Sequence, residues 1–364
     1  MNTPKKDGFS SIAETSEHLG TIIMFPERPD IWRNNAKEAQ EFIINLANII
    51  IKYENVIMCV KSHLLPLLKE RLNKNIKLFE VEYDDIWARD IAPNFIVRNE
   101  EIRAVSWEFN SWGGKDEGSY YPWYDDNKFA CSLANFLGIY CYQINDIILE
   151  GGAVITDGDG TLFTTENVLL NKNRNPLKSK IEIELCLKEY FCCEKVVWLP
   201  QGLFLDETNG HIDNLCSIVS PGEICLAWTD DKNDPQYEIS HNAYEILANE
   251  IDAHDRKFKI HKIILPHEQF ITKEESDGLV KLDTSVHRNE GMQLVPSYIN
   301  YYLINNGLIL PIFNCPQDEL AIEQMKKIFP KREIIPIYSK EILIGGGGLH
   351  CILHEIPYAM GIKW

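Results

Sequence analysis

The sequence contains no CxxC pair, no long apolar run and no low-complexity tract. Without a CxxC pair, we expect no structural zinc site. A membrane helix needs about 20 consecutive apolar residues, and the longest candidate, around Phe42–Ile51, is interrupted by Asn45 and Asn48. The first residues also lack the apolar segment of a signal peptide. We therefore expect a cytoplasmic protein with no membrane partner.

Basic residues are in the minority: 36 Lys and Arg stand against 54 Asp and Glu, which gives a formal net charge of −18. This excess opposes binding to nucleic-acid phosphates and favours a cationic ligand. The ten cysteines are scattered and mostly flanked by apolar residues, as in Ile57–Val60. That setting is typical of buried free thiols in a reducing compartment.

The sequence does contain a coarse unit, in which an amphipathic helix is followed by a short break and an apolar strand. Apolar residues recur with a period of 3.6 over residues 36–50, which predicts the first helix. Further helices are expected near 127–138, 178–192, 238–253 and 317–329, the last with Asp318 as its N-cap. The strands that follow the five helices are predicted at Asn55–Val60, Ile139–Tyr142, Lys195–Leu199, Lys259–Leu265 and Glu333–Tyr338. Five such units predict an α/β fold, either a sheet or a ring of five, in one domain over residues 1–364.

Two segments place carboxylates at the ends of apolar strands. Asp90 lies where a loop enters the strand Phe95–Val97, a common place for a functional residue, although a surface ion pair would explain it equally well. Glu150 follows an apolar strand and precedes Gly151–Gly152, which predicts that another group approaches the chain closely there. An ordinary strand-to-turn exit is the alternative. The nearby Asp157–Gly160 lacks the remaining ligands of a calcium loop and is better interpreted as a hairpin turn.

Two later segments carry the nucleophile and base candidates. His211 and Asp213 are two residues apart, so on a strand they would project from the same face. A metal site there would lack a visible third ligand. The four glycines Gly345–Gly348 predict a bend or a closely approaching ligand, and no Lys-Ser/Thr follows them as in a P-loop. A lone cysteine is more often a core thiol, but the position of Cys351 directly after His350 and a glycine-rich turn shifts the interpretation toward a nucleophile.

These candidates together comprise one thiol, one imidazole and several carboxylates, without a cofactor motif. Cysteine proteases and acyl transferases need a base and an oxyanion hole, but they do not need three acids in the pocket. A planar cation such as a guanidinium fits better, because carboxylates match its delocalised charge and its carbon is open to attack by sulfur. A thiol enzyme of the protease type would leave Asp90, Glu150 and Asp213 without a role.

Ordered blocks with a family pattern cover nearly the whole chain: Pro26–Asp30, Asp85–Asp90, Phe109–Gly114, Leu149–Gly152, Arg174–Pro176, Glu207–Asp213 and Gly345–Cys351. In these blocks the sequence resembles the agmatine deiminase family of the guanidine-modifying (pentein) superfamily. Two positions depart from the family pattern. Phe25 stands where the family usually has tryptophan, and Gly348 stands where it usually has asparagine. Loss of that asparagine is expected either to loosen the loop or to remove a hydrogen bond near Cys351.

The resemblance implies hydrolysis of agmatine to N-carbamoylputrescine and ammonia, with neither a metal nor an organic cofactor. It implies a five-bladed α/β propeller whose site lies in the central channel, and a homo-oligomer, a dimer or larger. Trp87 is expected to line the channel for the aliphatic part of the substrate. Two alternatives remain at this point: a related arginine or peptidylarginine deiminase, and a non-catalytic protein that binds polyamines or guanidines.

The resemblance also assigns roles to five residues. Cys351 is expected to be the nucleophile, His211 the general acid and base, and Asp90 and Asp213 the carboxylates that hold the guanidinium. Glu150 is expected to steady His211 or a guanidinium nitrogen. Because like charges oppose ionisation, a thiol among these carboxylates should have a raised pKa. We therefore expect it to ionise when the cationic substrate arrives, or as a pair with His211.

Overall fold

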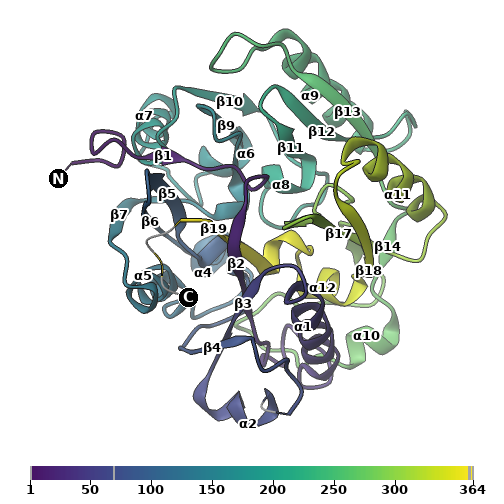
Figure 1. Cartoon of the computed structure of the whole chain (residues 1–364). Helices are drawn as coiled ribbons and strands as arrows, with labels where there is room; N and C mark the ends of the chain where they lie inside the picture. The colour runs from purple at the N-terminus through teal and green to yellow at the C-terminus, as the bar shows by residue number, and fades with distance from the viewer. Residues whose placement is uncertain (1, 69, 360–361, 363–364) are drawn as a thin grey trace.

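Five of the six small sheets are arranged as blades around a common centre in the computed structural model, which describes residues 2–68, 70–359 and 362 (Figure 1). Each blade repeats one pattern: an antiparallel strand pair continues through a helix into an outer strand, which runs parallel to its neighbour. The longer helices lie at the outside of the ring in Figure 1. This pattern is that of a five-bladed α/β propeller, as the family resemblance implied.

The first two blades come from the first half of the chain. One contains β1 (Ser10–Ser11), α3 (Ala88–Ile91), β5 (Asn94–Arg98), β6 (Glu101–Glu108), α4 (Gly114–Glu117), α5 (Asp126–Leu137) and β7 (Cys141–Ile148). The next contains the 3₁₀ turn η2 (Gly151–Ala153), β8 (Val154–Thr156), β9 (Thr161–Thr165), α6 (Glu166–Leu169), α7 (Lys180–Tyr190) and β10 (Lys195–Leu199). The hairpin predicted at Asp157–Gly160 is confirmed, because it joins the antiparallel strands β8 and β9.

The next two blades follow in sequence. One contains α8 (Ile212–Leu215), β11 (Cys216–Ser220), β12 (Glu223–Trp228), α9 (Gln236–Asn249) and β13 (Lys259–Ile264). The other contains β16 (Tyr302–Ile304), β17 (Gly307–Ile312), α11 (Gln317–Ile328) and β18 (Glu333–Tyr338). Between them lie the short strands β14 (Gln269–Phe270) and β15 (Gln293–Leu294), which pair with each other, and α10 (Lys273–Asp277).

The fifth blade joins segments from both ends of the sequence. It contains β2 (His18–Met24), α1 (Lys37–Ile50), β3 (Asn55–Val60), η1 (Ser62–Leu64), α2 (Leu65–Leu68), β4 (Lys77–Glu80), α12 (Lys340–Gly345), η3 (His350–Ile352) and β19 (Leu353–Pro357). Strand β19 pairs antiparallel with β2, with Leu353 opposite Ile23. This pairing joins the N-terminal and C-terminal segments of the chain within one blade and so closes the ring.

The five predicted helix–strand units are confirmed, one in each blade. Strands β3, β10 and β18 have the predicted bounds, whereas β7 begins later and ends later than the predicted Ile139–Tyr142. Strand β7 has exposed polar side chains at Gln143 and Asn145, between buried Tyr142, Ile144 and Ile147. Because this strand alternates polar and apolar residues, a prediction based on continuous apolar residues did not recognise its full length.

Two local predictions were wrong. Helix α11 begins at Gln317, and Asp318 lies inside its first turn, where its carboxylate accepts hydrogen bonds from the backbone of Phe313 and the Tyr298 hydroxyl. His211 and Asp213 do not lie on a strand, because Ile212–Leu215 forms the one-turn helix α8 before β11 begins.

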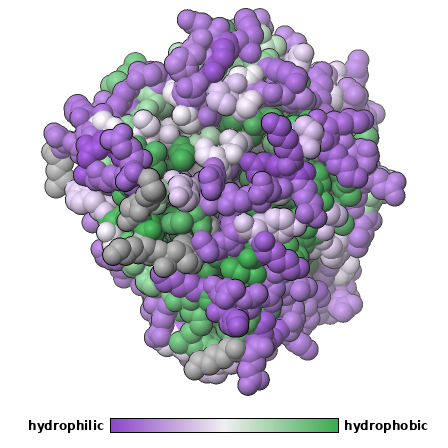
Figure 2. Space-filling view, in the orientation of Figure 1, coloured by the Kyte–Doolittle hydropathy of each residue, from purple (hydrophilic) through white to green (hydrophobic). Residues whose placement is uncertain are grey.

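The buried apolar side chains form three clusters under the blades. The face seen in Figure 2 is largely hydrophilic, in keeping with the high charge, with smaller apolar areas between the polar side chains. Within the part of the chain that the structure describes, no helix is long and apolar enough to cross a membrane.

Candidate active site

The site is built from the short segments that precede the first strand of each blade. Asp90 on α3 precedes β5, and Gly152 in η2 precedes β8. Asp213 on α8 precedes β11, Asn300 lies just before β16, and Cys351 in η3 precedes β19. Because the five blades are arranged around one centre, these equivalent positions converge there. All five lie buried within the protein.

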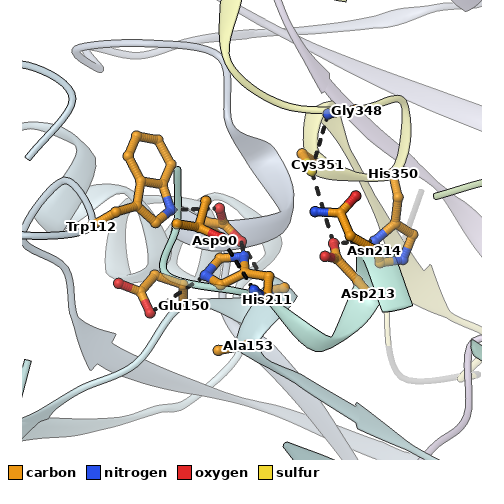
Figure 3. A network of polar contacts seen from close by, with 12 residues as sticks. Asp90, Trp112, Glu150, Ala153, His211, Asp213, Asn214, Gly348, His350 and Cys351 are labelled. Atoms are coloured by element: carbon orange, nitrogen blue, oxygen red, sulfur yellow. Dashed lines mark hydrogen bonds and ion pairs between the residues drawn. The ribbon is translucent and has the colours of Figure 1, made fainter. Parts of the chain in front are cut away.

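Asp90, Glu150 and His211 lie together on one side of the site, and Asp213, His350 and Cys351 on the other (Figure 3). Asp90 Oδ1 accepts a hydrogen bond of 2.8 Å from the Gly152 backbone N–H. His211 Nδ1 lies 3.9 Å from Asp90 Oδ1, and His211 Nε2 lies 3.7 Å from Glu150 Oε2. Neither nitrogen of the His211 ring lies within 3.5 Å of a hydrogen-bond partner among the described residues: Nδ1 faces Asp90 and Nε2 faces Glu150.

Gly152 lets three polar side chains approach the same point. A Cβ atom added to Gly152 would lie 2.7 Å from His211 Nδ1 and 2.9 Å from both Asp213 Oδ2 and Asp90 Oδ1. A Cβ on Gly151 would lie 2.0 Å from the Arg89 carbonyl oxygen. The close approach predicted at this glycine pair is therefore confirmed, and both positions require the absence of a side chain.

Substitution of Gly152 by alanine should reduce activity on the order of 100-fold, because the methyl group would displace His211, Asp90 and Asp213 by a fraction of an ångström or more. Steady-state kinetics on the purified variant measure the effect. Gly138→Ala, at the end of α5 and outside the site, is the control: a Cβ there meets no atom within 4 Å, but a φ of 70° strains alanine, so thermal unfolding first checks that both variants are folded. If Gly152→Ala retained the activity of that control, the packing described for the glycine would be incorrect.

The Cys351 thiol is surrounded by polar groups from three segments. The Gly348 backbone N–H and the Asn300 Nδ2 group donate to Cys351 Sγ over 3.4 and 3.7 Å. Asp213 Oδ2 lies 3.9 Å from the same sulfur. A Cβ on Gly348 would lie 2.1 Å from Asn300 Oδ1. The Asn300 amide thus occupies the space beside Gly348 and donates a hydrogen bond to the sulfur.

Glu150 is held by a buried ion pair. Its Oε1 atom accepts a hydrogen bond from Arg174 Nε, and both side chains are fully buried. Burial opposes ionisation of Glu150, but Arg174 and His211 outweigh it and lower its pKa to about 2. The second oxygen, Oε2, faces His211. Arg174 therefore keeps a negative charge beside the imidazole.

The titratable groups of the site shift one another's pKa values. Burial disfavours the charged form of His211, but Asp90, Glu150 and Asp213 outweigh it and raise its pKa to about 9. Burial raises the pKa of Asp90 to about 6, against the opposing effect of His211. Burial and the charges of Asp213 and Asp90 raise the pKa of Cys351 well above its ordinary value. The free site therefore holds an imidazolium beside a neutral thiol at neutral pH.

Alkylation of Cys351 in the free protein should be slow at pH 7 and should accelerate as pH rises above 9, because only the thiolate is an efficient nucleophile. The rate is measured with iodoacetamide by mass spectrometry of the peptide that contains Cys351. Half-maximal alkylation well below neutral pH would contradict the raised pKa and would indicate a thiolate–imidazolium pair with His211.

A pocket opens above the thiol. Its lining includes Trp87, Asp90, Trp112, Arg288 and Cys351. The Trp87 ring packs edge-on against Trp112, whose indole N–H donates to Asp90 Oδ2 over 2.9 Å. Arg288 is 4% exposed and is held by an ion pair with Glu207 and a hydrogen bond to the Gly345 carbonyl. The pocket thus combines aromatic walls with one carboxylate next to the sulfur.

All six predicted site residues come together: Trp87, Asp90, Glu150, His211, Asp213 and Cys351. Sequence reasoning missed Trp112, Asn300 and Arg174 as parts of the site. Trp112 has a backbone φ of 62°, a left-handed conformation that is rare for a bulky residue and is typical of functional sites. Within the described ranges, no group of three His, Cys, Asp or Glu side chains is arranged to hold a metal ion.

The chain belongs to the Porphyromonas-type peptidyl-arginine deiminase family, whose model matches residues 10–357. More particularly, the chain is similar to agmatine deiminases. It is 41% identical to the Pseudomonas aeruginosa agmatine deiminase over 358 residues, which cover 98% of this chain and 97% of that protein. It also superimposes on the solved Enterococcus faecalis agmatine deiminase with a TM-score of 0.95, at 35% identity and 98% coverage of both chains. The family resemblance seen in the sequence and the propeller fold are confirmed.

Proposed function

We propose that this chain hydrolyses agmatine to N-carbamoylputrescine and ammonia through a covalent intermediate on Cys351. One observation carries the proposal: the buried Cys351 thiol lies 3.9 Å from Asp213 Oδ2 and shares a pocket with Asp90, whose carboxylate lies 3.9 Å from the His211 ring. Such a site favours a flat cation with an electrophilic carbon. The full-length similarity to agmatine deiminases supports agmatine as that cation.

Each polar side chain has a role in this reaction. Asp90 and Asp213 accept hydrogen bonds from the guanidinium nitrogens and hold the carbon near Cys351 Sγ. Glu150 keeps His211 in its protonated form and in a fixed orientation. Trp87 packs against the aliphatic chain of the substrate.

The chemistry proceeds in two halves. Arrival of the cation favours release of the Cys351 proton to solvent, and Sγ then adds to the guanidinium carbon. The His211 imidazolium gives its proton to a nitrogen of the adduct, which leaves as ammonia, so that an S-alkylthiouronium remains on Cys351. Water next attacks this carbon and gives a proton to the now neutral His211. Finally the C–S bond breaks, the urea product departs and the thiol regains a proton.

The pocket lining favours agmatine over arginine. A substrate that carries a carboxylate requires a cation to pair with it. Arg288 is the cation in the described lining, and it is already paired with Glu207 and bonded to the Gly345 carbonyl. Agmatine has no carboxylate, so it leaves that pair intact.

An ammonia-release assay on agmatine, free arginine and a peptide ending in arginine tests the proposal. We expect turnover of agmatine alone, with an adduct on the Cys351 peptide trapped by rapid acid quench and identified by mass spectrometry. Greater activity on either arginine substrate would instead support an arginine or peptidylarginine deiminase. Binding of agmatine without ammonia release would indicate a non-catalytic binding protein.

Three further expectations remain predictions. Closure of the ring through β19 and β2 supports one domain over residues 1–364. A cytoplasmic location and a homo-oligomer, dimer or larger, are expected from the sequence and the family resemblance. Sedimentation analysis of the purified chain tests the last of these.

A further inference from the structure

His350 is a buried side chain that the reaction described above does not use. It precedes the nucleophile in η3 and is 4% exposed. Its Nδ1 atom lies 2.9 Å from Asp213 Oδ2 (Figure 3). Its Nε2 atom lies 2.9 and 3.1 Å from the two oxygens of Glu14. The imidazole therefore has a carboxylate on each ring nitrogen.

This geometry defines the protonation state of His350. Ionised carboxylates only accept hydrogen bonds, so both ring nitrogens must donate, and only the imidazolium has two N–H groups. Glu14 also pairs with Arg89, whose Nη1 lies 3.0 Å from Oε1, so Glu14 remains ionised. Burial and Arg89 oppose the charge on His350, but Glu14 and Asp213 outweigh them and raise its pKa to about 9.

The charged and titratable groups around His350 come from several elements of the ring. They are Asp213 from α8, Glu14 from the segment before β2, Arg89 from α3, Cys351 from the same turn, Glu355 from β19, and Tyr301 and Tyr302 at the start of β16. Glu355 is bound to Arg89 rather than to the imidazole. The two carboxylates in direct contact with the ring are thus those of Asp213 and Glu14.

We propose that His350 is a positioning residue, which holds Asp213 by one oxygen and leaves the other open to the substrate guanidinium. This inference rests on the proposed function. Asp213 Oδ2 is engaged by His350, whereas the buried Oδ1 atom has no hydrogen-bond partner among the described residues. A carboxylate fixed at one oxygen has its plane and its second oxygen fixed as well, so the guanidinium meets a preorganised acceptor.

The position of the proton donor can be tested with two amide variants. The amide nitrogen of asparagine lies near the place of a histidine Nδ1 atom, and that of glutamine lies near the place of Nε2. His350→Gln should therefore lose the contact with Asp213 and raise the KM for agmatine about 10- to 100-fold, the effect of one charge-assisted hydrogen bond. His350→Asn should recover most of this loss.

The ranking of the two variants by KM distinguishes a positioning role of His350 from a packing role. A side chain that only fills space would be replaced better by glutamine, which is the larger of the two, so packing predicts the opposite order in KM. Thermal unfolding of both variants checks that each is folded. If His350→Gln had the kinetics of the wild-type chain, or if His350→Asn were the poorer variant, the positioning role would be overturned.

Nitrogen NMR of the histidine rings provides a readout that does not depend on turnover. We expect both His350 nitrogens to be protonated at pH 7.5, with the signals assigned by their loss in His350→Asn. Glu14→Gln, which removes the charge at the partly exposed end of the contact, should shift deprotonation of His350 to lower pH. A neutral His350 at pH 7.5 in the wild-type chain would overturn the inference.

These readouts distinguish the inference from the proposed function. If the wild-type chain released no ammonia from agmatine but His350 were an imidazolium, the proposed function alone would fail. If agmatine were hydrolysed normally and the two amide variants were equal to wild type, the positioning role alone would fail.

Discussion

Replacement of Cys351 by serine should abolish ammonia release from agmatine, with a loss of at least about 10⁴-fold in kcat, because loss of a catalytic nucleophile has the largest effect of any single side chain. Binding should survive, since Asp90, His211 and Asp213 remain in place and serine is smaller than cysteine. Isothermal titration with agmatine measures the binding, and a coupled ammonia assay measures the rate.

A second cysteine provides the control for this variant. Cys131 is half-buried on α5, in the outer layer of its blade, and its thiol contacts Cys141 rather than the site. Cys131→Ser should therefore keep the wild-type rate. Ammonia release by Cys351→Ser at a rate near that of this control would remove the sulfur from the mechanism.

Substitution of His211 by glutamine should reduce kcat about 10²- to 10⁴-fold, the usual contribution of a general acid and base. In the wild-type chain the pKa of His211 is raised to about 9, so the acid form is present at neutral pH and is lost as pH rises through about 9. Activity of the wild type should therefore fall on the alkaline side. The residual activity of His211→Gln should lack that dependence.

The histidine variant also has a matched control. His241 on α9 stacks on Tyr237 and Trp228, away from the site. His241→Gln should keep both the rate and the alkaline limb of the pH profile. An unchanged profile in His211→Gln would mean that another group supplies the proton to ammonia.

The ring was predictable because its outer layer has strong periodic patterns. The 3.6-residue stripe of α1 and the apolar runs of β3, β10 and β18 are local signals that tertiary contacts did not override. The inner strands were less visible, and β8 with only three residues carries too short a pattern to be recognised. The local sequence pattern therefore predicted the helix–strand unit of each blade, whereas the family resemblance predicted that the blades form a ring.

The predicted site residues were found because they combine unusual residue types with glycines. Asn300 and Trp112 carried no such signal. Asn300 follows a mainly apolar segment without glycine, and its amide reaches Cys351 only because two blades meet at the centre. Trp112 appeared in a family block, but its contact with Asp90 depends on a left-handed backbone that the residue itself disfavours. Contacts of this kind follow from the fold and not from the local sequence.

The catalytic centre can be completed only after β19 has paired with β2, because Cys351 directly precedes β19. Asp90, Glu150, His211 and Asp213 leave the ribosome well before Cys351, which is followed directly by β19. The growing chain therefore contains the carboxylates and the imidazole of the site before it contains the thiol that attacks the substrate. Strand β19 directly follows Cys351, so its pairing with β2 both joins the two ends of the ring and brings the nucleophile to the centre.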